Sequence, residues 1–197
     1  MKEITPKDSR YVPLSQQKWC RVPACFQMVM LRHGVPLVPA ELLGYHLGLI
    51  VPKSEAKNFW NARTGPKPGG GYGTQYGKPA YRPNRVFEKL GIPLRVKETT
   101  IDTISSAEDL AGRLSDIVAE DCDALICFDW GTLMNRKYHG GHVCVLDRVL
   151  PDGKSVRIID PERGSKWKIV KVSKLYRAMQ YHGKAFKAGI WEVEKVD

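Results

Sequence analysis

The sequence predicts an α+β fold in which a buried N-terminal helix packs on a C-terminal antiparallel sheet. Apolar residues recur at helical spacing over 23–33, and helix-like segments dominate the chain up to about residue 119. From residue 124 onward, short β-branched and aromatic runs alternate with turn residues, as in strands joined by tight connections. Helices first and strands second are typical of α+β proteins.

The chain up to about residue 119 predicts four helices and one strand. A helix over 23–33 opens with Pro23 in its first turn and stops at Gly34. A second helix is expected over 39–49, and a short one over 83–90 that Gly91 closes, before a strand over 92–97. The capping-box pattern that begins at Ser105 predicts a further helix to about residue 119.

The second half predicts most of the sheet. Strands are expected over 124–130, 142–149, 155–160 and 167–172, with a tight hairpin turn at 151–153. A helix over 173–182 and a final strand over 188–193 complete the chain. We expect these elements to form one domain over residues 1–197, a length that suits a single adequate core.

A Gly- and Pro-rich segment, 65–79, lies within a stretch from 61 to 82 that we expect to be a loop. It matches neither glycine fingerprint for phosphate binding, because no Gly-Lys-Ser/Thr ends it. A long loop in a compact domain is often a lid or a binding loop. Tyr72, Gln75 and Tyr76 are the candidates for recognition contacts, and the alternative is an excursion without a role.

Composition narrows the class of protein. Residues 1–8 lack an apolar signal region and no apolar run reaches the roughly 18 residues of a membrane helix, so we expect a soluble, cytoplasmic protein. The chain has 5 cysteines and no Cys-x-x-Cys pair, which favours reduced thiols over disulfides or a structural zinc site. No metal or cofactor is expected. Three cysteines on apolar faces read as core residues: Cys25, Cys127 and Cys144.

The formal net charge of +10 favours anionic partners in general. Many basic residues follow Lys154, but no zinc finger, basic zipper or RNA-binding sheet signature accompanies them. A solvated basic face therefore explains them better than nucleic-acid binding. The expected partner is a peptide or protein substrate, with an acidic partner as an option, and the sequence does not indicate an oligomeric state.

Four residues could carry thiol chemistry. His142 begins one predicted strand and Asp160 ends the next, so the two side chains can meet if the strands pair antiparallel. Cys20 lies just before the first helix, where a helix N-terminus and an imidazolium would stabilise a thiolate. His142 would then deprotonate the thiol and Asp160 would orient the ring. An amide before the helix, Gln16 in preference to Gln17, could donate to a developing oxyanion.

These motifs resemble those of the papain-like cysteine peptidases that process bacteriocin leaders, and of their bacterial relatives. The resemblance rests on a Gln, then Trp-Cys, then Pro-Ala-Cys-x-Gln-Met-Val, a Gly-His strand, and Asp-Pro-x-x-Gly ending at Gly164. It covers about half of the chain. It implies a papain-like fold and a thiol peptidase or acyltransferase without cofactor. It also assigns oxyanion stabilisation to Gln16, nucleophilic attack to Cys20, and base and orienting roles to His142 and Asp160.

The resemblance leaves one position open. In that family a Gly-Pro-Ala-type step follows the nucleophile, so alignment back from Pro23 without a gap places Arg21, and not Cys20, in the nucleophile position. A one-residue shift of the backbone would return Cys20 to the site and give an enzyme, which is the hypothesis we favour from sequence. Without that shift, Arg21 at a helix N-terminus would need an anion beside it. The chain would then be an inactive pseudo-peptidase that binds a peptide or an acidic partner.

Overall fold

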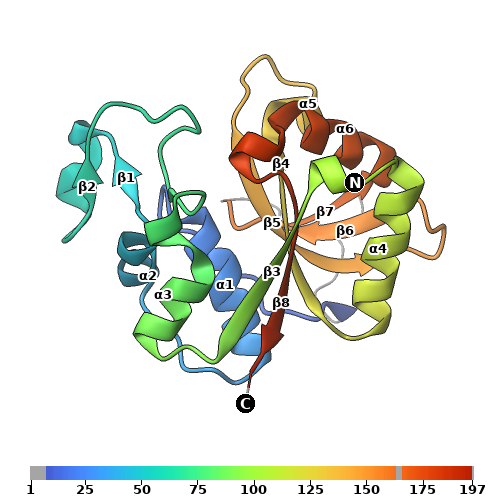
Figure 1. Ribbon diagram of the computed structural model, residues 1–197, viewed down its shortest axis with the longest axis horizontal. Coiled ribbons are helices and arrows are strands. Elements are labelled where there is room, and N and C mark those ends of the chain that lie inside the picture. Colours follow the sequence, from blue (N-terminus) through green and yellow to red (C-terminus); the bar gives the residue numbers. More distant parts are fainter. Residues whose placement is uncertain (1–7, 163–165, 197) are drawn as a thin grey trace.

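A computed structural model describes residues 8–162 and 166–196, arranged as a twisted antiparallel sheet with helices on both faces (Figure 1). The sheet order is β3-β8-β4-β5-β6-β7, and every neighbouring pair in it is antiparallel. This arrangement confirms the predicted α+β class. The helices are α1 (Arg21–Arg32), α2 (Ala40–His46), α3 (Pro83–Leu90), α4 (Ala107–Ala119), α5 (Trp130–Met134) and α6 (Val172–His182). The sheet strands are β3 (Leu94–Thr100), β4 (Asp123–Asp129), β5 (Gly141–Val149), β6 (Ser155–Ile159), β7 (Trp167–Lys171) and β8 (Gly189–Lys195).

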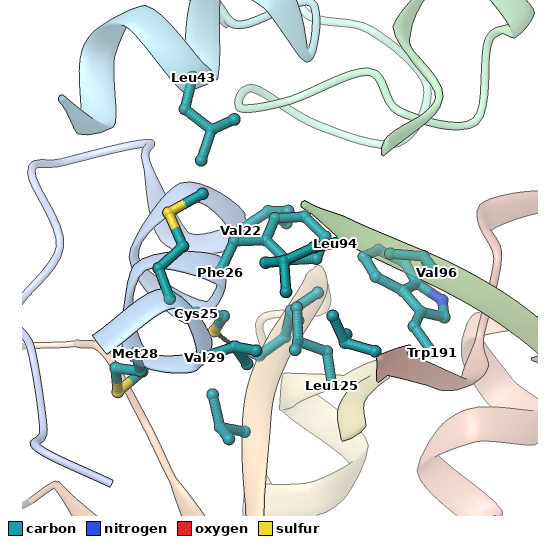
Figure 2. Close-up of a cluster of buried hydrophobic side chains, with 14 of the residues drawn as sticks. Val22, Cys25, Phe26, Met28, Val29, Leu43, Leu94, Val96, Leu125 and Trp191 are labelled. Carbon is teal, nitrogen blue, oxygen red and sulfur yellow. Dashed lines mark hydrogen bonds between the residues drawn. The ribbon is translucent and has the colours of Figure 1, made fainter. Parts of the chain in front are cut away.

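Helix α1 is the central packing element, as its apolar spacing predicts. Its buried side chains pack against one face of the sheet and against α2 and α3, which lie on the same side (Figures 1 and 2). Phe26 meets Phe87 of α3 edge to face, with ring centroids 4.9 Å apart. Leu125 and Trp191 supply the sheet side of this core (Figure 2). Burial of these rings fixes α1 across the sheet, with its N-terminus at the start of β5.

The opposite face of the sheet is covered by α4, α5 and α6 (Figure 1). Alternate residues of β4 and β5 point to this second core, among them Phe128 and Cys144. All seven residues of β4 are buried, which explains why its sequence reads as a continuous apolar run. Cys25, Cys127 and Cys144 are all buried, so the prediction that they are core residues is confirmed.

The segment between α2 and α3 holds more regular structure than predicted. Two short strands, β1 (Ile50–Val51) and β2 (Arg63–Thr64), pair in parallel, and Gly73 forms an isolated bridge to Ile50. A short 3-10 helix, η3 (Pro79–Tyr81), precedes α3. The Gly- and Pro-rich stretch 65–78 contains neither helix nor strand, so the loop prediction is confirmed there. It is wrong only at the flanks of 61–82, where β2 and η3 form, because tertiary pairing supplies hydrogen bonds that composition does not reveal.

Two local boundaries also differ from the sequence interpretation. The N-cap of α4 is Ser106, whose hydroxyl accepts from the backbone N–H of Asp109 at 3.1 Å, and not Ser105. Strand β4 stops at Asp129, because that carboxylate caps α5 by accepting from the N–H of Thr132 at 2.6 Å. Trp130 therefore begins a helix instead of ending a strand.

Across residues 8–162 and 166–196, no helix combines the length and the apolarity that crossing a bilayer requires. The organisation into one domain over 1–197 stays a prediction. Two features predicted from sequence, the polar start of the chain over residues 1–7 and Gly164 of the Asp-Pro-x-x-Gly motif, lie outside the described residues.

Candidate functional site

The structure brings His142 and Asp160 together. The antiparallel pairing of β5 with β6, in which Val145 lies opposite Ile159, places the start of one strand beside the end of the other. The Nε2 of His142 donates to Oδ1 of Asp160 at 2.9 Å, and both side chains are buried. The sequence reasoning anticipated this contact from the positions of the two residues on their strands.

The His142 ring is clamped in one orientation. Trp130 stacks on it with ring centroids 4.2 Å apart, and Phe128 packs against it on the adjacent strand. With Nε2 bound to the carboxylate, Nδ1 has no hydrogen-bond partner among the described residues. Burial and the nearby positive charge of Arg21 lower the pKa of His142 to about 4, against the opposing effect of Asp160. The imidazole is therefore neutral at physiological pH.

Asp160 is held as a carboxylate. Burial by itself would raise its pKa, but the hydrogen bond to His142 and the backbone N–H of Glu162, at 3.0 Å, together hold the pKa well below its usual range. Lys168 adds an ion pair to Oδ2 at 3.1 Å. A neutral imidazole that donates to a fixed carboxylate is the arrangement in which the free ring nitrogen can accept a proton.

Cys20 does not join this pair. Its side chain is fully buried and packs in a small apolar cluster with Leu49, Val51 and Phe59, on the α2 side of the chain. A Cβ added at Gly44 of α2 would lie 3.5 Å from its Sγ. Burial, and secondarily the charge of Glu41, raise the pKa of Cys20 to about 12. The thiol is thus protonated and turned away from His142.

The backbone explains this orientation. Trp19 adopts a φ of 73°, a left-handed conformation that a bulky residue rarely takes and that costs about 1–3 kcal/mol. Trp19 lies in a tight turn, which is closed by a hydrogen bond of 2.8 Å from the N–H of Cys20 to the carbonyl of Gln17. Helix α1 then begins at Arg21, so the side chain after the turn, and not Cys20, faces the sheet.

Arg21 occupies the space beside His142. Its Nη1 lies 3.5 Å from the carbonyl oxygen of Gly141, and its Nη2 forms an ion pair with Glu162 at 3.0 Å. No acidic residue lies in the first turn of α1, so the guanidinium opposes the positive end of the helix dipole. Glu162 supplies the compensating negative charge. Which of Cys20 and Arg21 holds the nucleophile position stays a prediction.

Gln16 also contacts Glu162. Its Nε2 donates to the same carboxylate oxygen, Oε2, at 2.5 Å, and its backbone N–H donates to the carbonyl of Pro161 at 2.8 Å. The amide expected to stabilise an oxyanion is therefore engaged by an internal anion. Gln16 and Arg21 together hold Glu162 at the entrance of the site.

A cavity of about 530 Å³ opens in front of Arg21 and His142. The Gly-rich segment forms one wall, and its role as a binding loop stays a prediction. Tyr72 packs edge to face on Trp19, with ring centroids 5.5 Å apart. The hydroxyl of Tyr76 forms a hydrogen bond of 3.3 Å with the Sγ of Cys127. The other walls come from β5, the end of α6 and the chain after it, including Gly141, His182, Phe186 and Lys187.

Within residues 8–162 and 166–196, one group of side chains has metal-ligating atoms within 4.8 Å of one another: His142, Cys144 and Asp160, all buried. Burial holds the pKa of Cys144 well above its usual range, so this thiol is protonated. Lys168 forms an ion pair with the Asp160 carboxylate, and the charge of Arg21 acts on His142. A metal cation would have to enter against these charges and break the hydrogen bond between His142 and Asp160, so the donor set fits a hydrogen-bonded pair better than a metal centre.

Neither a scan against protein-family models nor a search of curated proteins finds a match for this chain. Among solved structures, the crystal structure of a candidate C39-like peptidase from Bacillus anthracis aligns with it. The TM-score is 0.55, and the alignment covers 94% of this chain and 96% of the other at 18% sequence identity. This chain has a papain-like fold. At 18% sequence identity the structural similarity establishes the fold but not the activity. What the candidate site can do must therefore be argued from the residues of this chain.

Sequence reasoning missed several residues of this papain-like site. Glu162 stands inside the Asp-Pro-Glu motif, but nothing in the sequence shows that it faces Arg21 and Gln16. Trp19 is adjacent to Cys20, and its left-handed backbone has no sequence signal, since such a conformation favours glycine. The sequence predicts a strand at Trp130, whereas its stacking on His142 depends on the start of α5 at this residue.

The neutral state of His142 can be tested by titration. Between pH 6.5 and about 4 the unfolded chain binds a proton at this residue and the folded chain does not, so the free energy of unfolding should fall as pH decreases through that window. Replacing Arg21→Gln should raise the pKa of His142, because it removes the second-largest cause of the shift, and Arg21→Lys should keep it low. Nitrogen-15 NMR of the ring measures both. A wild-type pKa near 6.5 would contradict this account of the site.

Proposed function

We propose that this chain is a peptide-binding protein on a papain-like scaffold, in which Arg21 takes an anionic group of the bound peptide where a peptidase would present its nucleophile. The observation that carries the proposal is the exchange at the start of α1: the guanidinium of Arg21 lines the cavity and the thiol of Cys20 is buried among apolar side chains.

The electrostatics of the site favour an anion. Arg21 presents a planar fork of donors that matches a carboxylate, and it stands at a helix N-terminus, where negative charge is stabilised. Glu162 of the same chain already pairs with one side of the Arg21 guanidinium. Because its side chain is about half exposed, 47%, a ligand carboxylate can compete with it for the guanidinium. We therefore expect the site to select peptides that carry a carboxylate near the contact point.

The cavity also supplies apolar and basic contacts. Trp19 and Tyr72 offer aromatic surface, and Lys78 adds a positive charge from the Gly-rich wall. Aromatic side chains with a few placed polar groups are typical of ligand sites. A volume of about 530 Å³ accommodates a few residues of an extended peptide, and not a folded domain.

Affinity selection tests the proposal. Immobilised full-length protein is incubated with a degenerate hexapeptide pool, half of it with free C-terminal carboxylates and half amidated, and retained peptides are identified by mass spectrometry. Free acids or Asp/Glu-containing peptides should be enriched about tenfold or more. The enrichment should disappear in Arg21→Gln and increase in Glu162→Gln, which removes the internal competitor. Arg136→Gln, at an exposed site, is the matched control. Equal retention of acids and amides, or unchanged selection in Arg21→Gln, would refute anion recognition.

A second candidate function rests on the His142–Asp160 pair, which has the geometry of a base with its orienting carboxylate. In that proposal Cys20, His142, Asp160 and Gln16 form a thiol peptidase or acyltransferase, and the entry to α1 shifts by one residue to bring Sγ into the cavity. Gln16 would also have to leave Glu162. Cleavage of the same peptide pool by the wild-type protein, lost in Cys20→Ser, would favour this candidate over the binding protein.

A further inference from the structure

A second pocket, about 260 Å³ in volume, lies between α2, β2 and α3 and shares no lining residue with the cavity in front of His142. Two tyrosines and four basic side chains line most of it. Its lining consists of Tyr45, His46, Arg63, Ala80, Tyr81, Arg85, Val86 and Lys89.

The charges of this pocket are unbalanced. None of its lining residues is acidic. Among the ion pairs of residues 8–162 and 166–196, Arg63, Arg85 and Lys89 have no carboxylate partner. Arg85 and Lys89 lie one turn apart on α3, where like charges destabilise a helix. Burial, followed by the charges of Lys89 and Arg63, lowers the pKa of His46, which lines the same pocket.

Arg63 is held in place before any ligand arrives. Its guanidinium lies over the ring of Tyr45, 4.2 Å from the centroid, and over Tyr81 at 5.2 Å. Its Nη1 donates to the carbonyl of Tyr45 at 2.6 Å. Gly48, with a φ of 77°, lets Tyr81 pack directly on the backbone, because a Cβ at that position would collide with the ring. The remaining guanidinium donors are thus pre-positioned, which reduces the entropic cost of binding.

We propose that this pocket binds a phosphate dianion, either free or as the terminal phosphoryl group of a small molecule. Three permanent cations around one small space exceed what a single carboxylate neutralises, and a dianion with several acceptor oxygens balances them more fully. The volume admits a phosphoryl group with a small substituent. The proposal is independent of the function assigned to the cavity beside His142.

Calorimetric titration of the full chain with inorganic phosphate, pyrophosphate and phenyl phosphate, in low-salt buffer, tests this proposal and separates free phosphate from an organic ester. We expect saturable binding of at least one of them, weakened tenfold or more in Arg85→Gln/Lys89→Gln. The variant changes exposed positions, so folding should be kept, which circular dichroism verifies. Lys171→Gln/Arg177→Gln removes the same charge elsewhere and should change the affinity less than twofold.

Three results would overturn the proposal. They are the absence of saturable binding in the wild-type protein, equal weakening in both double variants, and equal affinity for sulfate and phosphate at matched ionic strength. Equal weakening would show that the overall positive charge, and not this pocket, attracts the anions.

Discussion

A thiol introduced at position 21, in Cys20→Ser/Arg21→Cys, is expected to react with iodoacetamide at neutral pH at least tenfold faster than Cys122, the half-exposed cysteine of the native chain. The position opens onto the cavity beside His142 and begins α1, so a thiolate there gains from the helix dipole. The substitution also removes the positive charge that helps to keep His142 neutral. The ring could then accept the proton of the thiol.

Two controls separate this effect from simple exposure. Adding His142→Gln should slow labelling at position 21 toward that of an ordinary thiol, because the base is lost and a ring-sized polar side chain remains. Glu162→Gln should speed labelling, because it removes a negative charge next to the thiolate. Labelling at position 21 that is no faster than that of Cys122, with or without His142, would show that this position is not aligned with the base.

In the wild-type protein, Cys20 is expected to be labelled roughly a thousandfold more slowly than an exposed thiol. With a pKa of about 12, its thiolate fraction at pH 7.5 is about three parts in a hundred thousand, against roughly a tenth for an ordinary cysteine. Burial among Leu49, Val51 and Phe59 slows access further. Mass spectrometry of tryptic peptides after timed alkylation measures the rate for each cysteine.

Labelling in urea is the control for this experiment, since all five cysteines should then react at similar rates. Cys122 should be modified first under native conditions, and the buried Cys25, Cys127 and Cys144 should resist like Cys20. Rapid modification of Cys20 in the folded protein would contradict the packing described here. It would mean that the entry to α1 shifts in solution, and it would move the proposed function to thiol catalysis.

The two labelling experiments decide between the functions together. If Cys20 is alkylated slowly in the wild-type protein and the thiol introduced at position 21 is alkylated fast, the nucleophile position of a peptidase-type site holds Arg21. That result supports peptide binding. Fast alkylation of Cys20 in the wild-type protein supports the thiol peptidase or acyltransferase. Slow reaction at both positions would leave His142 and Asp160 as a structural pair within the second core and would remove the basis of the thiol proposal.

Periodicity and turn chemistry predicted the fold because they reflect local rules. The spacing of apolar residues over 23–33 requires a helix with one broad buried face, and the runs after residue 124 require strands covered on both sides. The contact between His142 and Asp160 followed from strand order. In an antiparallel pair the first residues of one strand lie beside the last residues of its neighbour. The short pairing of β1 with β2 was not predictable in this way, because two-residue strands have no period.

The sequence alone determined the α+β architecture, the central helix and the imidazole–carboxylate pair, all of which follow from patterns that repeat over several residues. The tertiary structure, and not the sequence, shows that Arg21 lines the cavity and that Cys20 lies in the apolar cluster. That arrangement depends on a single left-handed residue, Trp19, whose conformation the surrounding packing must sustain against its intrinsic cost. This left-handed turn lies directly before Cys20 and Arg21, whose side chains point to different places: Cys20 into the apolar cluster beside α2 and Arg21 to the cavity beside His142.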